Sequence, residues 1–276
     1  MRLTTDALII RENNNIGESD RFVTALTREL GAVHASARGA RTLKNRGSVA
    51  TRLLSYSRLT LREGRSRDKY IIEDARPLRV FFDIHGDIAR LALAQYFCEL
   101  AGVLAPREEP AEEHLRLLLN ALHFLTEGKR DLRLIKAVVE LRLLTLSGYM
   151  PDLVGCQGCG EYEAEQFFFS PVTGTLLCGH CANGTPPQGS IPLTKDQLAA
   201  MRHIIYSQAN KVFQFKMTPQ GLRNLGKITE VYLQAQLDRQ FSSLDFYHRL
   251  RQTTLSLQQS LQKQPTTEIQ EHDEIE

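Results

Sequence analysis

Short apolar stretches separated by glycines characterise the chain up to Val80. The stretches are rich in β-branched residues and leucine, and polar and apolar residues alternate from Ser55 to Arg62, as in half-buried strands. They predict strands at residues 5–10, 21–27, 32–37, 55–62 and 69–73. Five short strands in one small region favour a closed barrel, and the five-stranded oligonucleotide-binding barrel (OB-fold) is the first candidate. An SH3-like barrel or a small open sheet is an alternative.

After Pro77 the apolar period lengthens to that of an amphipathic helix. It predicts helices at about residues 87–104, 110–128, 131–148, 194–207, 218–237 and 243–261. Asp131 is expected to cap one of them, and Thr194 with Gln197 to form a capping box at the start of another. Cys98 lies within the first helix and is expected to be a buried core residue. These helices should pack as one bundle, interrupted by residues 149–190.

The interrupting segment contains two CxxC pairs. Cys156 and Cys159 form the first pair, and Cys178 and Cys181 form the second after 18 intervening residues. Each pair makes a tight knuckle that aims two thiolates at one point, and two knuckles complete the tetrahedral set of a structural zinc site. The residues between the pairs predict a two-stranded hairpin, so the segment resembles a zinc ribbon or knuckle with one structural Zn²⁺. An iron–sulfur cluster or disulfides are the alternatives, and disulfides are disfavoured by the cytosolic location expected below.

Composition is that of an ordinary globular protein, with 42% hydrophobic and 24% charged residues, and it excludes a collagenous, coiled-coil or wholly disordered chain. The formal net charge of +2 hides a gradient. Residues 1–80 carry 16 Lys/Arg against 9 Asp/Glu, residues 81–263 carry 18 of each, and residues 264–276 carry five acids and no base. A basic N-terminal region indicates a polyanionic partner such as nucleic acid, although a solvated surface gives the same pattern.

The basic residues gather at two predicted loops of the barrel, one after the third strand and one around Gly64. Lys and Arg replace the counterions of phosphates there, and the two loops would form a groove for a nucleic-acid strand. The predicted DNA contacts are Arg38, Arg41, Lys44 and Arg46 in the first loop and Arg62, Arg65, Arg67 and Lys69 around the second. Few aromatic residues accompany them, which favours contact with the DNA backbone over base recognition.

Several function classes receive no support. The chain has no run of about 18 uncharged apolar residues, so no membrane span is expected. Its N-terminal residues lack the features of a signal peptide, and a cytoplasmic, nucleoid-associated location is expected. No Walker loop, HExxH or GxSxG motif is present, and no catalytic activity is expected. A nuclease whose carboxylates are assembled only by the fold is the remaining enzymatic alternative.

The ordered combination of motifs resembles the RecO family of DNA repair and recombination mediators. The motifs cover residues 31–46, Gly148-Tyr149-Met150-Pro151-Asp152-Leu153, the two CxxC pairs, and Phe169-Ser170 with Gly174 between them. The chain departs from the family at Leu54-Ser55-Tyr56, where members often carry Leu-x-Pro. Of the predicted DNA contacts, only the four basic residues of the first loop match positions of the family's motif, so the resemblance implies DNA contact for these four alone.

The resemblance implies a protein that binds single- and double-stranded DNA and anneals complementary strands. It also implies action with RecR, and in some cases RecF, to load RecA on strands covered by single-strand-binding protein. Family members recognise the acidic C-terminal tail of that protein on their helical domain. They have no established catalytic residues, and many carry a four-cysteine zinc site.

Together these patterns predict an α+β chain with four parts. Residues 1–80 form the OB-fold domain, residues 81–150 and 190–262 the helical domain, residues 151–189 the zinc insert, and residues 263–276 a disordered acidic tail. The tail could act as an internal polyanion that competes with DNA for the basic region. The alternative function is a zinc-ribbon adaptor between proteins, or a transcription factor, with an incidental basic N-terminal domain.

Overall fold

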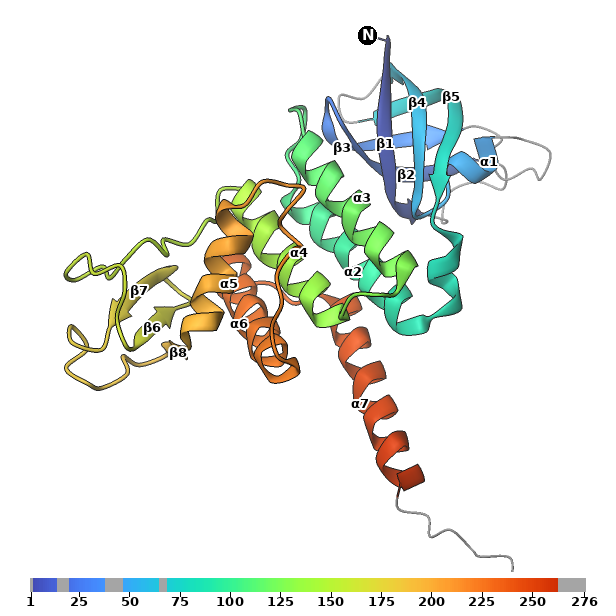
Figure 1. Ribbon diagram of the computed structural model, residues 1–276. Helices are drawn as coiled ribbons and strands as arrows, with labels where there is room; N and C mark the ends of the chain where they lie inside the picture. The colour runs from blue at the N-terminus through green and yellow to red at the C-terminus, as the bar shows by residue number, and fades with distance from the viewer. Residues whose placement is uncertain (1, 14–19, 38–46, 65–68, 263–276) are drawn as a thin grey trace, which may run out of the picture.

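The computed structural model describes residues 2–13, 20–37, 47–64 and 69–262, with the side chains of Lys69 and of residues 254–262 left out of the description. Figure 1 shows a barrel beside a helical body, with a small sheet projecting from the far end of that body. Within the described residues, no helix is both long and apolar enough to cross a membrane.

Five strands close the N-terminal barrel in the order β1-β2-β3-β5-β4, which confirms the predicted OB-fold. β3 and β5 pair in parallel, and the other neighbouring strands are antiparallel. Each predicted strand is present, most of them longer than expected, and a short helix, α1 (Gly47–Ala50), was not predicted. The strands are β1 (Arg2–Asn13), β2 (Arg21–Thr27), β3 (Gly31–Ala37), β4 (Ser55–Glu63) and β5 (Lys69–Val80).

The middle of β1 is buried on both of its faces. Ala7 and Ile9 point into the barrel, where they pack with Val23 and Leu59. Leu8 and Ile10 point outward and join the core of the helical body. This double burial explains why the sequence from Ala7 to Ile10 is continuously apolar and does not alternate.

The helical body consists of six helices after a short 3₁₀ turn. All six were predicted, and their capping signals hold: Asp131 accepts a hydrogen bond from the backbone N–H of Arg133, and Thr194 and Gln197 make both bonds of the capping box. The elements are η1 (Phe82–Gly86), α2 (Ile88–Leu104), α3 (Glu112–Glu127), α4 (Leu132–Leu146), α5 (Lys195–Tyr206), α6 (Pro219–Leu237) and α7 (Ser242–Gln262).

Main-chain hydrogen bonds add to the apolar contacts between the barrel and the helical body. The β2–β3 turn lies against the α2–α3 loop, where the N–H of Ala32 donates to the carbonyl of Pro106 at 2.9 Å. In the same contact the N–H of Glu108 donates to Leu30 at 3.0 Å, and that of Ala111 donates to Arg28 at 2.9 Å. A Cβ at Gly31 would lie 2.0 Å from the Pro106 carbonyl oxygen, so only glycine fits this position.

The four cysteines lie at a small three-stranded sheet of order β7-β6-β8, with Cys178 at the end of β7 and the other three in the adjoining turns. The predicted hairpin corresponds to β6 (Phe167–Ser170) and β7 (Thr175–Cys178), and the third strand, β8 (Ile191–Leu193), was not predicted. The ring of Phe169 packs edge-on against Tyr232 of α6, with centroids 5.3 Å apart. Gln236, also on α6, donates to the Pro171 carbonyl at 2.8 Å. These contacts fix the sheet on the helical body.

Candidate metal centre and nucleic-acid interface

The two CxxC pairs meet at one point. The Sγ atoms of Cys156, Cys159, Cys178 and Cys181 all lie within 4.8 Å of one another, and those of Cys159 and Cys178 are 3.7 Å apart. Two thiolates bound to one Zn²⁺ at about 2.3 Å in tetrahedral geometry would be about 3.8 Å apart, so the donor set fits a single metal ion. The structure therefore brings together all four of the cysteines predicted from their spacing.

Backbone geometry places these thiols. The N–H of Gly160 donates to the carbonyl of Cys156 at 2.8 Å and closes the first knuckle. In the second knuckle the N–H of Ala182 donates to Cys178 at 3.0 Å. A Cβ at Gly158 would lie 3.0 Å from the Sγ of Cys181, so the close approach of the knuckles limits this position to a very small residue. Sequence spacing alone was sufficient to find this cluster because both knuckles are local turns.

The electrostatics of the cluster favour a cation. Desolvation raises the pKa of the Cys156 thiol. Hydrogen bonds from the backbone N–H groups of Cys178, Cys159 and Gly158 outweigh this effect and lower the pKa to about 6. The hydrogen-bonding thiols of Cys159, Cys178 and Cys156 raise the pKa of Cys181 to about 12. Crowded thiols thus resist the loss of several protons, and a bound cation would remove that resistance because it stabilises every thiolate.

The predicted DNA-binding residues are placed only in part. Arg38, Arg41, Lys44, Arg46, Arg65 and Arg67 lie outside the described residues. The backbone of Lys69 opens β5, opposite His34 of β3. Arg62 lies at the exposed end of β4, where its Nε is 2.8 Å from Glu73 of β5. Arg62 therefore already has a carboxylate partner, which weakens the reading of this residue as a phosphate contact.

Other arginines on the barrel surface are paired in the same way. Nε of Arg58 lies 2.8 Å from Asp6, and Nε of Arg2 lies 3.0 Å from the same Glu73 that Arg62 contacts. These pairs reduce the positive charge on the β1–β4–β5 wall of the barrel.

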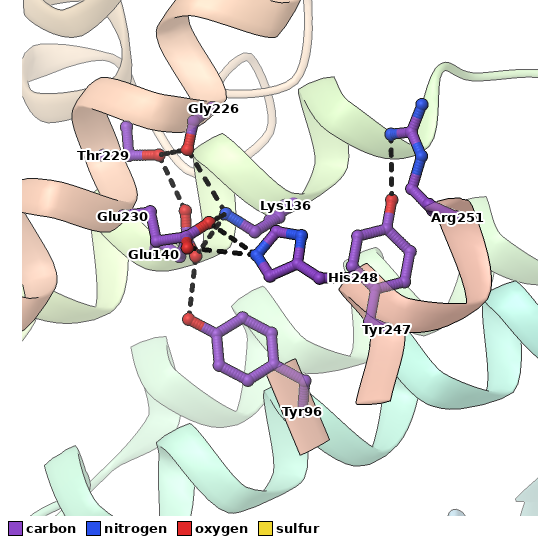
Figure 2. A network of polar contacts seen from close by, with 9 residues as sticks. All are labelled: Tyr96, Lys136, Glu140, Gly226, Thr229, Glu230, Tyr247, His248 and Arg251. Atoms are coloured by element: carbon purple, nitrogen blue, oxygen red, sulfur yellow. Dashed lines mark hydrogen bonds and ion pairs between the residues drawn. The ribbon is translucent and has the colours of Figure 1, made fainter. Parts of the chain in front are cut away.

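Sequence reasoning missed a network of buried charges between the helices (Figure 2). Lys136 of α4 lies 2.7 Å from Glu140 and 2.9 Å from Glu230 of α6. Glu140 also accepts hydrogen bonds at 2.7 Å from the hydroxyls of Tyr96 and Thr229. The i,i+4 spacing of Lys136 and Glu140 was visible in the sequence, but it is equally common on exposed helix faces.

Comparisons with known proteins agree with this arrangement. The family model described as "Recombination protein O N terminal" matches residues 1–81, and the model described as "Recombination protein O C terminal" matches residues 85–245. The chain is 33% identical over 253 residues to a DNA repair protein RecO of Symbiobacterium thermophilum, covering 89% of this chain and 96% of that protein. It is 30% identical over 248 residues to that of Acetivibrio thermocellus, covering 90% and 97%. With a closed barrel, a helical body and four clustered cysteines in the expected order, the chain belongs to the RecO family of DNA repair proteins.

Proposed function

We propose that this protein is a non-catalytic mediator of DNA repair and homologous recombination. It binds single- and double-stranded DNA, anneals complementary strands and, together with RecR, helps to load RecA on strands covered by single-strand-binding protein. The observation that carries the proposal is the OB-fold barrel in the most basic part of a RecO-family chain. The proposal includes RecF as a further partner and the nucleoid as the place of action.

The chemistry of annealing follows from charge. Two DNA strands repel each other through their phosphates, and a protein surface that replaces condensed counterions lowers the free-energy cost of their approach. Contacts to phosphates carry no sequence information, so the strands remain free to slide into register. Arg38, Arg41, Lys44 and Arg46 are the residues that we propose for this role, with Arg65, Arg67 and Lys69 beside them and Arg62 the weakest member.

The decisive experiment is strand annealing with and without single-strand-binding protein on the strands. Wild-type protein should accelerate annealing in both cases, and its DNA affinity should fall steeply, by about a thousandfold or more, between about 50 and 200 mM salt if at least six phosphates are contacted. Replacing Arg41, Lys44 and Arg46 together by alanine should weaken binding to every sequence about equally. The matched control replaces Arg116, Lys129 and Lys195, which are exposed on the helical body, and should leave binding unchanged.

Other outcomes point to the alternatives. Sequence-specific binding with a small salt dependence would favour a transcription factor, and no binding to any nucleic acid would favour an adaptor between proteins. Cleavage of DNA in the presence of Mg²⁺ would identify a nuclease and contradict the non-catalytic assignment.

We also propose that the cysteine cluster holds one structural Zn²⁺. Four thiolates would fill a tetrahedral site and leave no position for a substrate, so the ion would supply folding energy to the insert and not chemistry. The resemblance further implies that the helical domain recognises the acidic tail of single-strand-binding protein.

A further inference from the structure

A narrow groove lies between α6 and α7, with α4 at its base. Leu222 of α6 and Tyr247 of α7 line it with apolar surface, while Arg223 and Lys227 stand along the α6 side and Arg251 along the α7 side. Its volume is 210 Å³. Small-molecule sites usually measure about 300–1,000 Å³, so this groove suits one or two side chains of a peptide better than a cofactor.

The groove has more cations than its own acids neutralise. Glu230 in its wall is already bonded to Lys136 at 2.9 Å and to His248 at 3.0 Å. Arg223 is bonded to the side-chain oxygen of Gln220, and Arg251 donates to the hydroxyl of Tyr247 at 3.3 Å. In the described part of the chain, Arg223, Lys227 and Arg251 have no carboxylate within salt-bridge distance.

The chain itself carries a segment with the complementary chemistry. Residues 264–276 contain five acids and no lysine or arginine, and two isoleucines, Ile269 and Ile275, are spaced among the acids. The segment follows α7, the helix that forms one side of the groove. Acidic side chains of this segment would face Arg223, Lys227 and Arg251, which have no carboxylate partner among the described residues.

The distance can be spanned. Arg251 and Gln262 are separated by 11 residues of α7, or about 16 Å at 1.5 Å per residue. An extended chain covers about 3.3 Å per residue, so residues 263–276 reach up to about 46 Å. The segment is therefore long enough to return along α7 and enter the groove.

We propose that residues 264–276 bind the groove between α6 and α7 in cis and exclude acidic peptides of other proteins from it. A tethered segment acts at an effective concentration of up to about millimolar, so even a weak site would be largely filled. The proposal does not depend on the DNA-binding function, and it differs from competition at the barrel because the cations involved belong to α6 and α7.

The test uses a fluorescein-labelled peptide with the sequence of residues 264–276 and measures its anisotropy with full-length protein and with protein that ends at Lys263. We expect the peptide to bind the shortened protein, and to bind the full-length protein at least tenfold more weakly because the tethered segment competes. Arg223→Glu combined with Lys227→Glu should abolish binding to the shortened protein. The matched control is Arg116→Glu combined with Lys195→Glu, two exposed sites away from the groove, and should leave binding intact.

Equal binding to full-length and shortened protein would overturn the proposal, because it would show a groove open to acidic peptides from partners. Absence of binding to the shortened protein, with its circular dichroism unchanged, would also overturn it. A third variant replaces all five acids of the segment by their amides in the full-length chain. This chain should bind the labelled peptide as the shortened protein does; binding that stays weak would contradict a charge-based contact.

Discussion

The ammonium of Lys136 lies 2.7 Å from the carboxylate of Glu140, one helical turn away on α4, and neither side chain is more than 4% exposed. Burial disfavours the charged form of Lys136, but the adjacent Glu140 and Glu230 outweigh it and raise the pKa of the lysine. The lysine is therefore charged inside the helical body. Through hydrogen bonds to Tyr96, Thr229 and Glu230, the pair connects α4 with α2 and α6 (Figure 2).

Removal of one partner should be much more costly than loss of a surface pair. Lys136→Met leaves Glu140 as a buried charge without its counter-ion, and we expect a loss of about 3–5 kcal/mol in the free energy of unfolding. Urea denaturation followed by circular dichroism measures it. Arg116→Met, which breaks an exposed pair with Glu113 of 3.8 Å, is the control and should cost less than about 1 kcal/mol. Equal losses in the two variants would contradict the buried-charge interpretation.

Acid should weaken the contact between α6 and α7. Burial raises the pKa of Glu230, but the hydrogen bond from His248 and the charge of Lys136 lower it to about 2. The carboxylate remains ionised in the folded protein at a pH where the unfolded chain takes up a proton, so its stabilisation is complete above about pH 4.5 and is lost as the pH falls toward 2. Unfolding midpoints of wild type and Glu230→Gln should therefore converge over this window. Glu113→Gln, an exposed site, should show no such convergence.

Gly31→Ala should destabilise the junction between the barrel and the helical body. The residue has a φ of +64° and its added Cβ would overlap the Pro106 carbonyl. Gly148→Ala is the matched control, because Gly148 has a φ of +89° but no heavy atom within 4 Å of the added Cβ. The control should show only the backbone cost of about 1–2 kcal/mol, and Gly31→Ala should lose clearly more in thermal unfolding. Equal losses would indicate that the loop moves aside.

Metal content should follow the cysteine cluster. Purified protein should contain about one zinc per chain by elemental analysis and show no visible absorption of an iron–sulfur cluster. Cys156→Ser should lose the metal, and the insert should become sensitive to proteases because it has little core without the ion. Cys98→Ala keeps all four ligands and is the control. If the purified protein instead contained iron and absorbed visible light, the site would hold an iron–sulfur cluster and not zinc. Metal retained in Cys156→Ser would contradict the four-thiolate site.

Local patterns were sufficient to predict many parts of this fold. The strands, the helices and the caps at Asp131 and Thr194 each depend on residues a few positions apart, and the knuckles at Cys156 and Cys178 do too. Long-range features were not predictable in this way. The parallel pairing of His34 with Lys69 closes the barrel between segments that are distant in the sequence. The strand β8 has only three residues, and Pro192 at its centre argues against a strand in the sequence pattern.

Burial inside the helical body was also beyond local patterns. In the first predicted helix the apolar residue Ile88 is 60% exposed, while Leu93 and Phe97 are fully buried. α2 is buried around most of its circumference because the barrel, α3, α4 and α7 all pack against it. A helix with several neighbours has no single apolar face, so the buried hydrogen bond between Tyr96 and Glu140 could not be inferred from the periodicity.

The junction at Gly31 has a consequence for how such a chain can diverge. Its main-chain hydrogen bonds join Arg28, Leu30, Ala32, Pro106 and neighbouring residues, and the guanidinium of Arg28 adds an ion pair with Glu112 at 3.1 Å. Exchange of the surrounding side chains leaves the main-chain bonds in place, as long as position 31 remains glycine. Side chains elsewhere on the two surfaces can therefore diverge while these main-chain bonds and the buried contacts of Leu8 and Ile10 keep the barrel against the helical body.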